Sequence, residues 1–276
     1  KTKNQGFKYG RFDFIITNPP FGSTVKQTEK AYLHQYSFAV RDVDWLNPKS
    51  VAAARPNQDT EILFIEQCWN YLNEGGYLAI VIPDSILTNS SLQYVRDNIE
   101  ELYRIVAVVS MPGTAFAATG AGVKSSVLFL KKHTAAQTKK IRDTKQALKD
   151  TIREEQNFRQ TLDNLEKEKK TILKNFTGFD NTEKLKGKEL KESEAYKVWT
   201  KGVSESFAEK MEEIRYRLSE IYEERRRKAL DDYNIFMAIA EDIGYDATGR
   251  TTKTNELDPI ASELARFIKA IEEDRE

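Results

Sequence analysis

The sequence has 276 residues, enough for one large domain or two ordinary ones, and its 43 basic residues balance its 43 acidic residues. This balance excludes a strongly basic protein but allows a local basic groove. The single cysteine, Cys68, excludes an internal disulfide framework. With two histidines we expect no metal cluster, and without a membrane-spanning run or signal peptide we expect a soluble, cytoplasmic protein.

The first expected element is a buried strand over residues 12–16, where "FDFII" is short, apolar and partly β-branched. It runs directly into Asn18-Pro19-Pro20-Phe21. Two adjacent prolines remove two backbone donors and fix φ twice, so the strand must stop there. Residues 22–58 show no sustained period, and we interpret them as a long irregular loop with one short helix around 32–40.

Apolar residues from 59 to 72 recur at three- and four-residue spacing, which predicts an amphipathic helix with Asp59 or Thr60 as N-cap and Gly75 and Gly76 as its stop. The run "YLAIVIP" predicts a strand buried on both faces. A helix near 91–101 and the strands "RIVAVVSMP" and "SVLFLKK" follow. This alternation is typical of a doubly wound α/β sheet.

Residues 137–231 change character, because two long stretches of apolar residues at helical spacing flank a segment with two glycines. We expect two long helices folded back as an antiparallel coiled-coil hairpin. Residues 233–250 then predict a strand and a tight turn, and 258–273 an amphipathic helix. The expected organisation is therefore a sheet domain over 1–136, a hairpin insertion over 137–231 and a return to the sheet over 232–276.

The segment at 18–21 places an amide, a rigid turn and an aromatic ring at the carboxyl end of a strand, where open α/β sheets bind ligands. The Asn18 side-chain oxygen and the Pro19 carbonyl can accept the two hydrogens of an exocyclic amino group and favour its attack on a methyl group. Phe21 offers a face on which a base can stack. The plainer interpretation is a proline turn whose phenylalanine belongs to the core.

The segment "FDFIITNPPFG" resembles motif IV of N6-adenine DNA methyltransferases. The resemblance continues through "TEILFIEQCWNYLNEGGYLAIVIPDSILTNSS" and "RIVAVVSMPGTAFAATGAGVKSSVLFLKK", and these segments are similar to the modification subunits of type I restriction–modification systems. It covers residues 10–132 and, more weakly, 233–250. It implies the C-terminal part of a Rossmann-like, S-adenosylmethionine-dependent methyltransferase sheet that carries the helical hairpin as an insertion.

For the site, the resemblance implies that Asn18, Pro19 and Pro20 form the catalytic turn and that Phe21 stacks on an adenine rotated out of the duplex. Residues 112–124 would form a loop beside the base pocket. Phe116 is either a second aromatic there or a core residue, and Lys124 either contacts phosphate or faces solvent. Asp84 follows a strand, and we interpret it as loop structure.

The family binds S-adenosylmethionine through a glycine-rich turn and an acid that both precede motif IV. Only about 17 residues precede Asn18, so we expect the cofactor site upstream of residue 1 and no methylation by this chain alone. The implied activity is site-specific adenine N6-methylation within a restriction–modification system. The implied partners are DNA and a specificity subunit or domain that meets the hairpin, with a restriction subunit as a further candidate and no membrane.

Two alternatives remain at this point. Enzymes that methylate RNA or a protein amide also use Asn-Pro-Pro-aromatic motifs, although Tyr is more usual there than the Phe21 found here. The chain could also be a non-catalytic assembly module whose hairpin does the binding. Loss of DNA methylation in a folded Asn18→Ala variant would separate the enzyme from the module.

Overall fold

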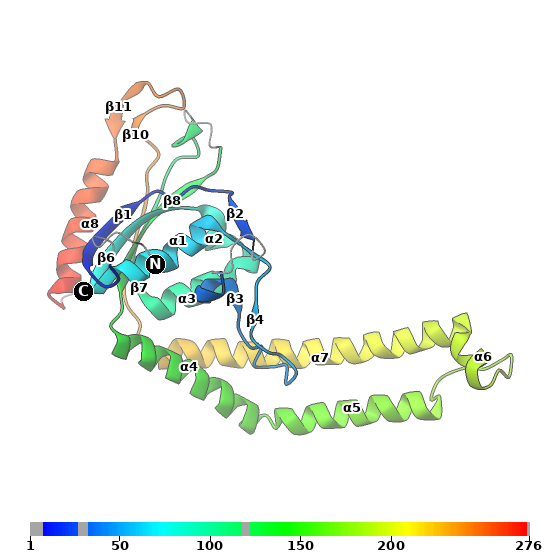
Figure 1. Ribbon diagram of the computed structural model, residues 1–276. Coiled ribbons are helices and arrows are strands. Elements are labelled where there is room, and N and C mark those ends of the chain that lie inside the picture. Colours follow the sequence, from blue (N-terminus) through cyan, green and yellow to red (C-terminus); the bar gives the residue numbers. More distant parts are fainter. Residues whose placement is uncertain (1–7, 27–32, 118–121, 275–276) are drawn as a thin grey trace. The chain divides into compact units, whose positions relative to one another are not determined.

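The computed structural model describes residues 8–26, 33–117 and 122–274, and the chain divides into two compact units (Figure 1). The sheet unit comprises residues 1–142 and 232–276, and the helical unit comprises 143–231. The second unit is thus an insertion in the sequence of the first. This arrangement confirms the predicted α/β class with an inserted helical hairpin.

The sheet unit is built on five strands in the order β1-β6-β8-β7-β9. Their bounds are β1 Phe12–Thr17, β6 Leu72–Pro83, β8 Ser125–Lys132, β7 Tyr103–Ser110 and β9 Phe236–Ile239. β1 pairs parallel with β6 and β9 parallel with β7, whereas β8 lies antiparallel between β6 and β7. The strands were predicted, but the direction of β8 was not, because a fully buried apolar run carries no sign of direction.

Helices cover both faces of this sheet. α1 (Thr60–Tyr71) and α3 (Gln93–Leu102) pack on one face, where Ile62, Ile65 and Ile99 meet Leu78, Ile80 and Ile82 of β6. α8 (Leu257–Glu272) packs on the opposite face, and its Phe267 ring lies 6.0 Å from that of Phe236 (Figure 1). Alternation along the strands separates these two clusters. The shorter α2 (Asp84–Thr88) and η3 (Ser90–Leu92) lead into α3.

The predicted stop of α1 at Gly75 and Gly76 is wrong. The helix ends at Tyr71, and β6 begins at Leu72 and contains both glycines. A Cβ atom on Gly76 would lie 3.0 Å from the Asn73 carbonyl oxygen and 3.1 Å from that of Asp13. Gly76 is therefore required for the close approach of β6 to β1, at the register shift between Phe12 and Phe14, and not for ending a helix.

The segment between β1 and α1 is irregular, as expected, but it holds short paired strands. β2 (Thr24–Lys26) pairs antiparallel with β5 (Asn57–Asp59), and β3 (Val40–Arg41) with β4 (Ala53–Ala54). In place of the single helix predicted around 32–40, residues 33–39 form two 3₁₀ turns, η1 (Leu33–Gln35) and η2 (Ser37–Ala39), and residue 32 lies outside the described residues.

Between β8 and β9 lie the helices α4 (Ala135–Glu155), α5 (Phe158–Asn175), α6 (Gly187–Glu192) and α7 (Glu194–Ala229). α7 lies antiparallel to α4 and α5, because Glu155 at the end of α4 pairs with Arg225 at 2.6 Å and Glu168 of α5 pairs with Lys210 at 3.1 Å (Figure 1). The first of the two antiparallel segments of the hairpin, which precedes α6, was expected to be one helix. It is divided between α4 and α5 at Asn157, whose φ of 48° is left-handed.

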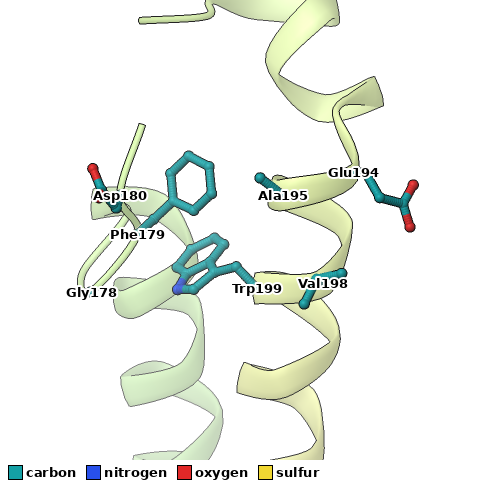
Figure 2. Close-up of a pocket in the computed structure, with 7 residues that line it drawn as sticks. All are labelled: Gly178, Phe179, Asp180, Glu194, Ala195, Val198 and Trp199. Atoms are coloured by element: carbon teal, nitrogen blue, oxygen red, sulfur yellow. The ribbon is translucent and has the colours of Figure 1, made fainter. Parts of the chain in front are cut away.

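An aromatic cluster joins the end of α5 to the start of α7. The Trp199 ring centroid lies 5.2 Å from that of Phe179 and 6.1 Å from that of Phe176. Figure 2 shows the Phe179 and Trp199 rings between the two segments, beside an open pocket. The pocket is lined by Gly178, Phe179, Asp180, Glu194, Ala195, Val198 and Trp199. Ring contacts of this kind stabilise the hairpin beyond the area that they bury.

After β9 the chain forms a small hairpin of β10 (Ile243–Tyr245) and β11 (Thr251–Asn255) before α8. It contains the predicted tight turn, where the Asp246 carboxylate accepts the N–H groups of Thr248 and Arg250 at 2.8 and 3.0 Å. Among the helices of the described residues, none is both long and apolar enough to cross a membrane.

We expect Gly76→Ala to lower the free energy of unfolding by about 1–3 kcal/mol, because the added methyl group meets the Asn73 carbonyl within β6 and the Asp13 carbonyl of β1, which cannot move away without parting β1 from β6. The measurement is urea unfolding followed by circular dichroism. Gly113→Ala is the matched control, since a Cβ atom there meets nothing within 4 Å. It should change the free energy of unfolding by less than about 0.5 kcal/mol. Equal effects of the two variants would contradict the role given to Gly76.

Candidate functional site

One edge of the sheet collects the loops that carry the predicted site residues. β1, β6, β7 and β9 all run in the same direction, because β1 and β6 are parallel, β8 is antiparallel to β6 and β7, and β9 is parallel to β7. Their carboxyl ends therefore share one edge, which is where open α/β sheets bind ligands. Asn18 follows β1 there, Asp84 follows β6 and Met111 follows β7.

The Asn-Pro-Pro-Phe segment (residues 18–21) leaves this edge directly after β1. Asn18 is exposed, and its side chain forms no hydrogen bond with another described residue. Pro19 is buried, Pro20 is exposed and Phe21 is half-buried. Gly22 ends the segment with a φ of 72°, a left-handed turn that glycine adopts without strain. The segment thus presents an unengaged amide on a backbone fixed by a buried proline.

Hydrogen bonds attach the exit of the segment to the N-terminus of α1. The N–H and the hydroxyl of Thr60 donate to the Ser23 carbonyl at 2.9 and 2.7 Å. Asp59, a predicted N-cap, occupies that position but makes no side-chain capping bond. Its carboxylate accepts the Thr24 hydroxyl at 3.1 Å instead. The start of α1 therefore holds the loop after Phe21.

Glu61, in the first turn of α1, is a buried carboxyl group that sequence reasoning did not single out. Its exposed fraction is 7%. Burial raises the pKa of the carboxyl group, and the nearby charge of Asp59 adds to this rise. The backbone N–H groups of Glu61 itself and of Gly22 lower the pKa and partly offset the rise. Since the folded-state pKa lies above the unfolded value, the contribution of Glu61 to stability decreases as pH rises through that folded pKa. The sequence offered one sign of this burial: Glu61 stands next to Ile62, which the helical spacing places on the buried face of α1.

Lys124 and Asp84 form a polar cluster that joins three strand ends. The Lys124 ammonium donates to the Ser110 hydroxyl at 2.6 Å and to the Met111 carbonyl, and it lies 4.0 Å from the Asp84 carboxylate. The Ser126 hydroxyl donates to Asp84 at 2.8 Å. These contacts connect the start of β8 to the ends of β6 and β7. The Lys124 ammonium therefore interacts with groups of the chain itself.

Phe116 lies in the loop after β7 and is half-buried against an apolar cluster that includes Met111, Ala115 and Ile243. The Tyr245 hydroxyl donates to the Ala115 carbonyl at 3.2 Å and attaches the β10–β11 hairpin to this loop. Residues 118–121 of the predicted loop at 112–124 lie outside the described residues. Phe116 therefore packs against this cluster at the edge of the sheet and remains partly accessible.

No glycine-rich turn in the described residues follows a strand and opens a helix, which is the arrangement that a nucleoside cofactor would need. The described part of the chain therefore does not by itself fit a complete S-adenosylmethionine pocket. It also holds no group of three or more His, Cys, Asp or Glu residues arranged to bind a metal ion.

Solved structures similar to the chain include a Listeria monocytogenes protein assigned to the class I S-adenosylmethionine-dependent methyltransferases, at 24% identity over 45% of this chain, with a TM-score of 0.32. A modification subunit assigned to a type I restriction enzyme of Vibrio vulnificus is 21% identical over 45% of this chain, with a TM-score of 0.33. A chain of a type I restriction–modification system is 26% identical over 44%, with a TM-score of 0.31.

The chain spans less than a third of each of these structures: 32%, 23% and 21% of their lengths. No curated protein matches its sequence. The family model for N-6 DNA methylases matches residues 2–213, which include β1, the Asn-Pro-Pro-Phe segment and the loop after β7. The chain belongs to the N-6 DNA methylase family.

Proposed function

We propose that this chain is part of an enzyme that methylates the N6 amino group of adenine at specific DNA sites, as the modification component of a restriction–modification system. The observation that carries the proposal is the Asn-Pro-Pro-Phe segment directly after β1, with the Asn18 amide exposed and unengaged by the described residues. Membership of the N-6 DNA methylase family supports the same chemistry.

Asn18 and Pro19 supply the two acceptors that the reaction needs. The adenine amino group is a poor nucleophile because its lone pair delocalises into the ring. Hydrogen bonds from its two N–H groups to the Asn18 side-chain oxygen and the Pro19 carbonyl favour a more pyramidal nitrogen and stabilise the positive charge that develops on it. Pro20 restricts the turn, so the two acceptors need little reorganisation as the reaction proceeds.

Phe21 supplies the surface on which the extruded base is held. An adenine must leave the duplex before its amino group can reach the acceptors, and stacking on an aromatic ring offsets part of the cost of unstacking. A half-buried ring suits this role, because one face can pack on the protein while the other receives the base.

We propose that S-adenosylmethionine, which supplies the methyl group, is bound mainly by polypeptide upstream of residue 1, so that this chain alone is inactive. The edge of the sheet supports this. β1 is the terminal strand of the described sheet, yet Phe14 and Ile16 on it are exposed, Ile16 by 78%. Exposed apolar side chains on an edge strand favour a sheet that continues beyond it.

The first prediction concerns Asn18. In the protein extended through its natural upstream sequence, Asn18→Ala should reduce methylation by about 100-fold or more, because one of the two acceptors is lost. The measurement is transfer of label from S-adenosylmethionine to N6-methyladenine in unmodified DNA. Asn47→Ala is the matched control, since Asn47 also precedes a proline but its side chain accepts the Lys49 N–H at 3.0 Å, within its own turn.

Label that persists in Asn18→Ala would remove Asn18 from the mechanism. Label absent from the natural protein, even with a specificity partner present, would favour one of the alternatives: an RNA or protein amide as substrate, or an assembly module without catalysis. Label on RNA or on a glutamine side chain would identify the first of these.

Phe21 and Phe116 should respond differently to truncation. Phe21→Ala should weaken binding of the extruded base by about 1–3 kcal/mol with little effect on folding. Phe116→Ala should lower the free energy of unfolding by about 2 kcal/mol, because it removes a ring from an apolar cluster. The measurements are 2-aminopurine fluorescence at the target position and urea unfolding. A loss of base extrusion in folded Phe116→Ala would place that ring in the base pocket as well.

We further propose that the helical unit meets the specificity subunit or domain that reads the DNA sequence. Val198 lies beside the aromatic cluster and is 63% exposed, which leaves an apolar surface at the hairpin (Figure 2). Val198→Glu should abolish co-purification with that partner while circular dichroism shows unchanged helix content. Val51→Glu is the control, an exposed valine in the sheet unit. Unchanged assembly of Val198→Glu would contradict this role for the hairpin.

A further inference from the structure

The loop after β7 leaves the sheet at the same edge as the Asn-Pro-Pro-Phe segment. Its described first part, residues 112–117, begins with a turn in which the Ala115 N–H donates to the Pro112 carbonyl at 3.0 Å, and it carries Phe116. The loop ends at Lys124, directly before β8. The contacts that fix this loop on the strands therefore bear on the geometry of the proposed site.

The backbone pairing of β7 with β8 stops where the loop begins. After the bond from the Met111 N–H to the Ser125 carbonyl at 3.1 Å, the described residues show no further backbone hydrogen bond between the two segments. The Lys124 carbonyl belongs to another contact, because it accepts the Asp84 N–H after β6 at 3.0 Å. Any further connection between the two ends of the loop must therefore come from side chains.

The Lys124 ammonium makes this connection. It donates to the Ser110 hydroxyl at 2.6 Å and to the Met111 carbonyl, and it lies 4.0 Å from the Asp84 carboxylate. An ammonium group has three donors and no acceptor, so the oxygen atoms that it needs are supplied here by the ends of β6 and β7. Met111 precedes the loop and Lys124 closes it, and the two ends are thereby joined.

The other use of a lysine at this edge is a contact with a DNA phosphate, and 44% of the Lys124 side chain is exposed. An exposed ion pair such as the one with Asp84 contributes little by itself. The bonds to Ser110 and Met111 decide between the two uses, because an ammonium turned toward a phosphate would have to give them up.

We propose that Lys124 is a positioning residue: its ammonium joins the two ends of the loop after β7 and so fixes residues 112–117 at the edge of the sheet where the base is handled. The consequence for catalysis rests on the proposed function. The joining itself is a property of the folded chain and can be tested without any substrate.

The test uses Lys124→Met, which removes the ammonium and keeps most of the length of the side chain, and Ser110→Ala, which keeps the ammonium and removes one acceptor. In each variant of the whole chain the Met111 and Ala115 amides should exchange with solvent roughly fivefold faster or more, as measured by nuclear magnetic resonance. The double variant should exchange no faster than Lys124→Met alone, because both changes remove the same connection. Unchanged exchange, or effects that add, overturns the proposal.

Lys131→Met is the matched control. Lys131 lies near the other end of β8, and its ammonium pairs with Glu272 of α8 at 2.7 Å. This variant also removes an ammonium that the chain itself engages, but at the opposite edge of the sheet. It should leave exchange of the Met111 and Ala115 amides unchanged. Equally fast exchange in Lys131→Met would show a general loss of stability and would overturn the role given to Lys124.

In the protein extended upstream, with its specificity partner, Lys124→Met and Ser110→Ala should each lower kcat by about tenfold and leave KM for S-adenosylmethionine unchanged, because a displaced loop misaligns the base and not the cofactor. The salt dependence of DNA affinity should stay the same. A phosphate contact predicts the opposite pattern: Lys124→Met would reduce the slope of log K against log salt by about 0.9, and Ser110→Ala, which retains the charge, would change nothing. That pattern overturns the proposal.

The two kinds of measurement separate this inference from the proposed function. If the natural enzyme transfers no methyl group, the proposed function fails, while amide exchange still decides whether Lys124 positions the loop. If both variants exchange faster but kcat does not change, the position of the loop has no part in catalysis and the inference is overturned.

Discussion

The parallel pairing of β1 with β6 determines where the proposed chemistry takes place. It brings the carboxyl end of β1 to the edge that also receives the ends of β6, β7 and β9. The pairing depends on Gly76, since any larger residue there would meet the Asp13 carbonyl. Gly76 therefore helps to set the location of Asn18, although the two residues are more than 50 positions apart in the sequence. The link between them is the pairing of β6 with β1 in the sheet.

Much of the sheet unit could be predicted because its elements carry clear periods. The apolar runs of β1, β6, β7 and β8 and the three- and four-residue spacing in α1 and α8 were sufficient to locate them. The short strands β2 to β5 could not be found, since two or three residues show no alternation and their pairing depends on contacts distant in sequence. The glycine pair at 75 and 76 was misassigned for a related reason: a close approach between strands leaves no local mark.

The candidate site could be predicted only where its functional residues are adjacent in the sequence. Asn18 to Phe21 form one contiguous motif, so their order alone suggested a function. Glu61 lies 40 positions beyond Phe21 and reads as an ordinary acid in the first turn of a helix, which is also where the helix dipole favours one. Lys124 was left open, and the structure shows why: its partners at Ser110, Met111 and Asp84 belong to other strand ends.

The site combines a fixed backbone with an unengaged side chain. Transition-state stabilisation requires acceptors that are already in place, and a buried Pro19 between two attached segments provides this for the backbone. Substrate recognition requires that the Asn18 amide remain free to bind, which an exposed position provides. Internal hydrogen bonds to Asn18 would stabilise the fold but would occupy the group that meets the base. A stable attachment is therefore built from residues beside the motif, where the N–H and the hydroxyl of Thr60 donate to the Ser23 carbonyl, outside the reacting groups.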